Sequence, residues 1–153
     1  MITDRTQTDV DYALLIRNKL IQGEPLTPQE QADYMAGLRG AYNISDLNRV
    51  ESKVEELRNR HIANGYPVEA IEIKTWQKGD FLKRTDFEQY LNNLDILKTA
   101  YFIKMDTPVT PKVSDWINYK IANDIEKILV DIENILNNMI ASLLYCGDTI
   151  GVI

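Results

Sequence analysis

The chain has very few of the residues that build disulfides, zinc sites and nucleophilic catalytic centres. It contains one cysteine, Cys146, and one histidine, His61. A single cysteine excludes a disulfide within the chain, and one histidine with one cysteine supplies too few ligands for zinc. A catalytic triad of the Ser-His-Asp or Cys-His type would have to use His61. We expect both residues to be packing residues, with an intermolecular bridge through Cys146 as the alternative.

The sequence also lacks the loops that hold phosphates and calcium ions. No Gly-x-Gly-x-x-Gly pattern occurs, and no glycine-turned calcium loop follows the nearby carboxylates of Asp4, Asp9 and Asp11. We interpret these three as helix-start residues that complement the helix dipole. The 23 acidic residues make chance carboxylate pairs certain. We therefore predict no catalytic residue, no cofactor and no metal, and we predict that the protein is not an enzyme.

Positive charge and long apolar runs are scarce as well. The formal net charge is −6, and the densest basic group, around Lys78, Lys83 and Arg84, is interrupted by Asp80 and Asp86. Phosphate backbones and anionic lipids would repel such a chain. No uncharged apolar run approaches the roughly 20 residues of a membrane span, and no signal-peptide pattern opens the sequence. We expect no nucleic-acid partner and no membrane partner, and folding in a cytoplasm.

What the sequence does contain is helical periodicity, which predicts one all-α domain over residues 1–153. Two segments, Thr27–Glu30 and Thr85–Glu88, have the form of capping boxes that open helices. We expect a bundle of four to five helices and at most a minor extended or β segment at Val68–Trp76. The expected helices cover residues 8–22, 28 to Gly37 or Gly40, 46–64, 85–101 and 114–146.

Two of these helices give specific expectations about their apolar faces and starts. In the first, the candidate apolar positions are Val10, Leu14, Ile16, Leu20 and Ile21. The third is expected to begin at a cap formed by Ser45 or Asp46. Its apolar stripe consists of Leu47, Val50, Val54, Leu57 and His61.

The longest helix and the tail that follows it make up residues 112–153. Its apolar residues recur at spacings of four and three, and the stripe is wide enough to be covered from two sides, as in a bundle. We expect Gly147-Asp148 to end the helix. The apolar residues after it are too few to form a core, so Thr149, Ile150, Val152 and Ile153 are our candidate interface, docking either on their own domain or on a neighbouring subunit.

The third and last helices share a short pattern. Asn48-Arg49-Val50-Glu51 matches Asn123-Asp124-Ile125-Glu126 at the asparagine, the branched apolar residue and the glutamate. With this offset, Val54, Leu57 and His61 align with Leu129, Ile132 and Leu136. Either a helical unit has been duplicated, or two amphipathic helices are alike by chance.

Three segments of the chain resemble small structural proteins of tailed phages and prophages. They are Ala41–Glu51, with its Asp-Leu-Asn-Arg-Val-Glu helix start, Ile2–Asp11 and Ala122–Leu129. The resemblance implies a structural or adaptor component of a phage tail or baseplate, including the region where fibres attach. We expect partners among other virion and tail proteins, a homo-oligomer, and a location in the virion and, during assembly, in the host cytoplasm. The alternative is a small soluble regulatory or chaperone-like binding protein of a mobile element.

Overall fold

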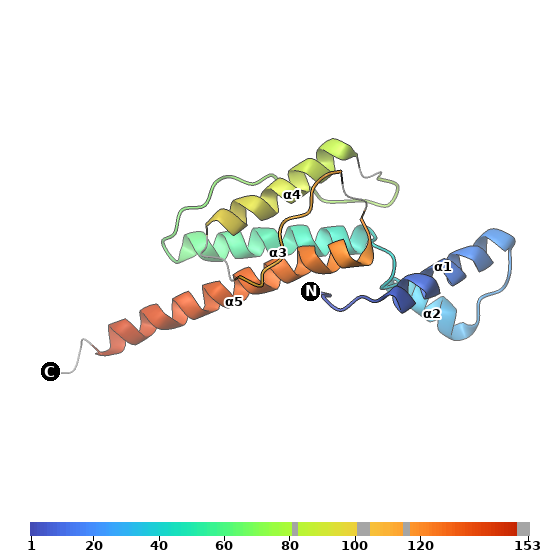
Figure 1. Cartoon of the computed structure of the whole chain (residues 1–153), viewed down its shortest axis with the longest axis horizontal. Coiled ribbons are helices and arrows are strands. Elements are labelled where there is room, and N and C mark those ends of the chain that lie inside the picture. Colours follow the sequence, from blue (N-terminus) through green and yellow to red (C-terminus); the bar gives the residue numbers. More distant parts are fainter. Residues whose placement is uncertain (81–82, 101–104, 115–116, 150–153) are drawn as a thin grey trace.

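The structure is a computed structural model that describes residues 1–80, 83–100, 105–114 and 117–149, with side chains described as far as Ser142. Within this part the chain forms five helices and no strand (Figure 1). The expected all-α fold with a long C-terminal helix is confirmed. The helices are α1 (Gln7–Gln22), α2 (Pro28–Ala36), α3 (Ile44–Ala63), α4 (Arg84–Thr99) and α5 (Tyr119–Thr149).

The core lies where α3, α4 and α5 pack against one another. Both apolar stripes that the sequence indicates face this core. Ile128 and Ile132 of α5 are completely buried, as are Val50 and Leu57 of α3. From α4 the core receives five apolar side chains: Phe87, Tyr90, Leu91, Leu94 and Leu97. Helix α5 is covered from two sides, as its wide stripe predicts.

The start of α3 differs from the expectation. Asn43, rather than Ser45 or Asp46, is the N-cap, and its side-chain oxygen accepts the backbone N–H groups of Ser45 and Asp46. Asp46 is the third helical residue and returns a hydrogen bond to the Asn43 backbone. This reciprocal pair is a capping box, and it begins the helix two residues earlier than we expected.

The other helix ends also differ from the expectation. Helix α4 begins at Arg84, directly after Lys83, so Thr85 does not cap it, and no side chain hydrogen-bonds at that cap. Helix α5 begins at Tyr119 rather than Ser114, and the Asn118 side chain accepts the backbone N–H groups of Lys120 and Ile121. At its other end α5 continues through Gly147, because one glycine costs a helix only about 1 kcal/mol.

The segment expected to be strand-like is extended but forms no β-ladder with any described residue. Residues 66–76 run across α3 and α4 and are fixed by side chains of those helices. Asn48 of α3 both donates to the Trp76 carbonyl, at 2.9 Å, and accepts its N–H, at 2.8 Å. Asn93 of α4 donates to the carbonyl of Glu72. Two asparagines thus replace the backbone partners that a neighbouring strand would offer.

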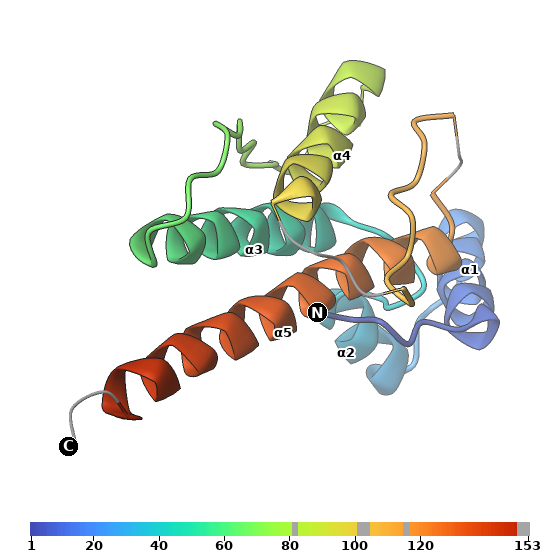
Figure 2. The same ribbon diagram turned by 60° about the vertical axis from the view of Figure 1, so that its left-hand side comes forward.

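Helices α1 and α2 form a hairpin that stands beside the three-helix core (Figures 1 and 2). The hairpin lies at the end of the molecule where α5 begins. The last turns of α5 extend beyond the core at the opposite end, and both views agree on this arrangement. Among the described helices, none is long and apolar enough to cross a membrane.

Replacing Ile128 with Asp should lower the free energy of unfolding by several kcal/mol, because it places a charge at a position without solvent access. Urea unfolding followed by circular dichroism measures the loss. Asn134→Asp adds the same charge at an exposed position of the same helix and is the control. Equal stability of the two variants would contradict the buried position of Ile128.

Candidate protein-binding surface

The hairpin is attached to the core by a buried cluster of charged residues. Arg5, just before α1, donates from Nη2 to Asp46 of α3 at 3.0 Å and to Glu126 of α5 at 2.7 Å. The three side chains are 2%, 5% and 0% exposed. Arg49 of α3 joins the cluster by donating to both carboxylates. Two guanidinium groups therefore face two carboxylates, which compensates the charges that folding removes from water.

The backbone of the N-terminal arm is held at the same place. The N–H of Ile2 donates to Glu126. Asn123 of α5 accepts the N–H of Arg5 at 3.0 Å and donates to its carbonyl at 2.9 Å. Burial would raise the pKa of Glu126, but the hydrogen bonds from Arg49, Ile2 and Arg5 outweigh it and lower that pKa below its ordinary value. Glu126 is therefore ionised in the folded protein at neutral pH.

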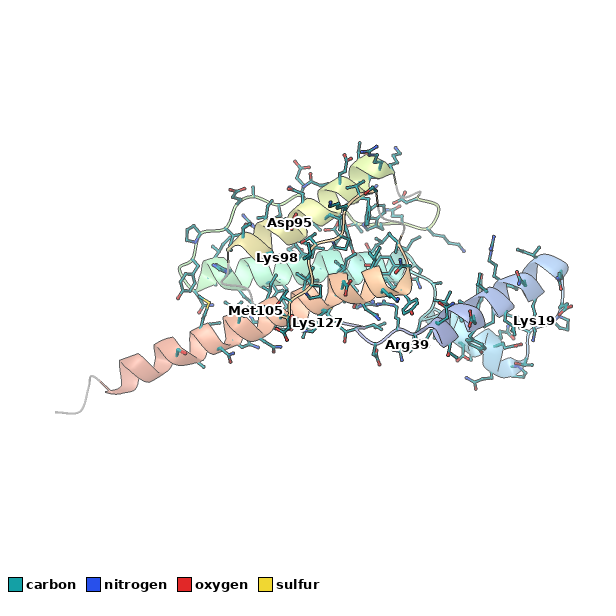
Figure 3. All side chains as sticks on the ribbon, viewed as in Figure 1. Lys19, Arg39, Asp95, Lys98, Met105 and Lys127 are labelled. Atoms are coloured by element: carbon teal, nitrogen blue, oxygen red, sulfur yellow. The ribbon has the colours of Figure 1, made fainter. Side chains whose placement is uncertain are left out.

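The return of the chain from α2 to α3 is fixed by a close backbone contact. Gly40 lies against the first turn of α1, and a Cβ atom at this position would overlap the carbonyl oxygen of Asp9. This overlap with backbone excludes every residue except glycine. Nearby, Arg39 lies at the base of the hairpin (Figure 3). It pairs with Asp4. Both chain connections of the hairpin are thus held, so its direction relative to the core is set.

Polar contacts join the two helices of the hairpin to each other. Both begin with complete capping boxes, Thr6 with Asp9 and Thr27 with Glu30. Lys19 of α1 donates to Glu30 of α2 at 2.6 Å, and Tyr12 donates to Asp33 at 2.7 Å. The apolar contribution is small, since the buried apolar residues of the two helices are Ala13 and Ile16.

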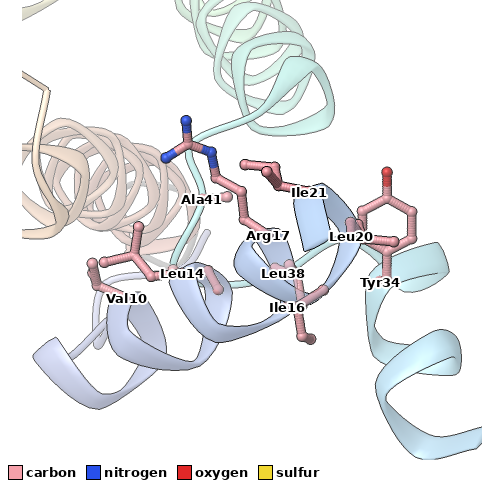
Figure 4. Close-up of a pocket in the computed structure, with 11 residues that line it drawn as sticks. Val10, Leu14, Ile16, Arg17, Leu20, Ile21, Tyr34, Leu38 and Ala41 are labelled. Carbon is pink, nitrogen blue, oxygen red and sulfur yellow. The ribbon is translucent and has the colours of Figure 1, made fainter. Parts of the chain in front are cut away.

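Most of the other apolar residues of the hairpin are exposed to solvent. Ile21 is 70% exposed and Met35 79% exposed. Leu14, Leu15, Leu20 and Tyr34 are each close to half exposed. Between α1 and the chain that leads to α3 lies a groove of about 480 Å³ (Figure 4). It is lined by Val10, Ala13, Leu14, Ile16, Arg17, Leu20, Ile21, Tyr34, Leu38, Gly40 and Ala41. Contiguous apolar surface of this kind marks sites that bind other proteins or ligands.

We did not expect this surface from the sequence, because we listed these residues only as the apolar positions of the first helix and placed the candidate interface in the C-terminal tail. Of Val10, Leu14, Ile16, Leu20 and Ile21, only Ile16 is buried. A signal was present in the spacing. Val10, Leu14 and Ile21 fall on one face of a helix, whereas Ile16 and Leu20 fall on another. A helix with two apolar faces carries more apolar surface than its own fold covers, and residues of both faces, Ile16 and Leu20 included, line the groove.

The residues that the sequence singled out have different positions in the structure. Thr149 is the last residue of α5, and Ile150, Val152 and Ile153 lie outside the described residues, so the interface assigned to them stays a prediction. His61 is 2% exposed and packs edge-on against Tyr66, and burial lowers its pKa. Within the described part of the chain, no three His, Cys, Asp or Glu residues come close enough to hold a metal ion.

A second, polar crevice of about 530 Å³ lies between α3, α4 and the extended segment. Its notable residue is Glu51, which accepts a hydrogen bond from Asn93 at 3.4 Å. Burial raises the pKa of Glu51 to about 7. The neighbouring Asp86 is paired with Lys74. One carboxyl group in this crevice therefore changes charge near neutral pH.

Comparison with known proteins gives no relative: no protein-family model, no curated protein and no solved structure matches the chain.

Replacing Glu126 with Gln should lower the free energy of unfolding by roughly 3 kcal/mol at pH 7, because the buried Arg5 and the partly buried Arg49 then share one carboxylate instead of two. The folded pKa of Glu126 lies below 4.5, so its contribution is present above pH 4.5 and is lost as the pH falls through that lower pKa. The variant should therefore lose less stability than the wild type on acidification. Glu133→Gln, at a half-exposed position of α5, is the control in urea unfolding.

The stability contribution of Glu51 depends on pH in the opposite direction to that of Glu126. Its folded pKa is about 7, above the ordinary 4.5, so ionising it opposes folding and stability falls as the pH rises from 4.5 to 7. Glu51→Gln should remove this fall, making the variant more stable than the wild type at pH 8 by about 1 kcal/mol. Urea unfolding at pH 5 and pH 8 measures the difference. The exposed Glu55→Gln is the control, and an equal pH response of all three proteins would contradict the assignment.

Proposed function

We propose that the protein is a structural or adaptor component of a phage tail or baseplate and that it acts by protein–protein assembly. The observation that carries the proposal is the α1–α2 hairpin, which is held firmly at its base and presents apolar side chains to solvent. Keeping such a surface exposed is unfavourable in water, and contact with another protein would relieve that cost.

The phage setting comes from the resemblance of Ile2–Asp11, Ala41–Glu51 and Ala122–Leu129 to virion structural proteins. These segments contain the residues of the buried charge cluster: Arg5 in the first, Asp46 and Arg49 in the second, and Glu126 in the third. The three segments that resemble virion proteins are therefore the segments that attach the hairpin to the core. In this proposal the segments preserve the position of the binding surface, and the partners are other virion and tail proteins.

The proposal assigns no reaction to the protein. Glu51 is held by Asn93 in a crevice next to a paired Lys74–Asp86 couple, and we assign it a structural role. A small regulatory or chaperone-like binding protein of a mobile element remains the alternative, since it would also use an exposed apolar surface. The two differ in whether the protein stays in the finished particle.

The experiment is mass spectrometry of purified particles from cells in which the encoding element is induced. We expect the protein in the particles at a fixed ratio to other tail proteins. The double substitution Ile21→Glu and Met35→Glu should remove it from particles without unfolding it, because both side chains are largely exposed. Gln31→Glu with Ala32→Glu adds the same charge to exposed positions of the hairpin and should be incorporated normally.

A protein that is abundant in the lysate and absent from particles would contradict the structural role and favour the regulatory or chaperone-like one. Normal incorporation of the Ile21→Glu and Met35→Glu variant would remove the hairpin from the binding surface.

A further inference from the structure

Two features of the molecule lie at opposite ends of the fold. One is the groove of the α1–α2 hairpin. The other is the end of α5, which extends past the last residues of α3 and α4 (Figures 1 and 2). After the buried Leu136, the half-buried Met139 and Ile140 still pack against the core. The sequence continues the same apolar spacing to Leu143.

The end of α5 matches the groove in charge and in length. No charged residue occurs from Asn134 to Gly147, although such residues make up 26% of the chain. A helix end whose one charge, Asp148, stands next to its last residue can place the uncharged turns before it in an apolar groove without burying an unpaired ion. From Leu136 to Thr149 the helix is about 20 Å long, and the 16 residues of α1 that border the groove span about 24 Å.

The groove is also suited to a helix rather than to a compact ligand. Seven of its eleven lining residues belong to α1, and they run from Val10 to Ile21, along most of the length of that helix. Recognition of an apolar helix by such a groove is a common mode of protein binding. Arg17 is the one charged residue in the lining and forms no ion pair with any described residue.

The end of α5 cannot reach the groove of its own molecule. The two lie at opposite ends of the fold, and α5 is a continuous helix between them (Figure 1). A contact between them must therefore join two copies of the chain.

We propose that the end of α5, residues 137–149, docks in the α1–α2 groove of a second copy of the protein. This contact uses different surfaces on the two copies, so each copy can bind one neighbour at each end. Such a head-to-tail contact builds a ring or an open chain of copies rather than a closed dimer. The inference rests on the proposed function, because it names the partner that the exposed hairpin binds.

The test uses two variants that each remove one half of the contact. Leu14→Glu with Ile21→Glu places charges in the groove, at side chains that are 45% and 70% exposed. Leu143→Glu with Leu144→Glu introduces charges into the uncharged end of α5. Circular dichroism melts establish that both variants fold. Gln31→Glu with Ala32→Glu, on the hairpin but outside the groove lining, is the matched control.

Size-exclusion chromatography with light scattering should show that the wild type and the control form oligomers, which have one fixed size if the contact closes a ring and grow with concentration if it builds an open chain. Each variant alone should have the 17.6 kDa mass of one chain. An equal mixture of the two should form a species of twice that mass and nothing larger, because one intact groove meets one intact helix end.

Each other outcome overturns the proposal. Self-association of the groove variant alone would show contact between helix ends, and self-association of the α5 variant alone would show contact between grooves. A wild type that stays monomeric at every concentration would also overturn it. In that last case the presence of the protein in purified particles would still support the proposed function, which needs other partners only.

Discussion

The contact on which the rest of the structure depends is the one between Arg5 and Glu126. It joins the first residues of the chain to its last helix, and both side chains are almost without solvent access. Removing two charges from water costs several kcal/mol for each ion, and the cost is repaid only when the hydrogen-bonding capacity of both is used. Asp46, Arg49 and the Ile2 N–H supply those additional partners. Misplacing any one of the three segments would leave a buried charge uncompensated.

The repeated pattern in α3 and α5 has a physical counterpart. Asn48 and Asn123 each hold the backbone of an extended segment through a pair of hydrogen bonds, to Trp76 in one case and to Arg5 in the other. Three residues further along, Glu51 and Glu126 are both buried. The asparagine at the matching position of each helix therefore holds an extended segment that belongs to no sheet. The two glutamates have different surroundings, since Glu126 accepts from two arginines and Glu51 accepts from the amide of Asn93.

Much of the fold could be predicted from the sequence, because helix stripes and glycine stops are local signals. The stripe of α3 and that of α5 face the core as their spacing indicates, and Gly23 and Gly37 end α1 and α2. Helix starts were less predictable. Asn43 and Ser45 are both good N-cap residues, and Asn43 is the one whose backbone N–H lies three residues before Asp46 and can donate to its carboxylate. The charge cluster could not be predicted at all. Arg5 looks like any polar residue near a terminus until α5 is in place.

The candidate surface was missed for a related reason. Periodicity tells which faces of a helix are apolar, but not how many of them the rest of the fold covers. The tail after α5, which the sequence made the candidate interface, lies outside the described residues, so that assignment depends on the apolar sequence of the tail alone. The groove, by contrast, depends on the close contact between Gly40 and α1, which brings residues 38–41 beside that helix. A contact of this kind between distant residues has no local signal in the sequence.

The pairing of Arg5 with Glu126 also sets an order of events during synthesis. The two residues are separated by 121 positions, so the arm has no place to dock until most of the chain has left the ribosome. Local helices form in about a microsecond, whereas translation adds roughly 5–20 residues per second. For several seconds the hairpin therefore has no fixed position on the core, and its apolar face is exposed to solvent. During this time the charge cluster lacks Glu126. Once α5 has formed, Arg5 can pair with Glu126, and the N-terminal arm becomes fixed.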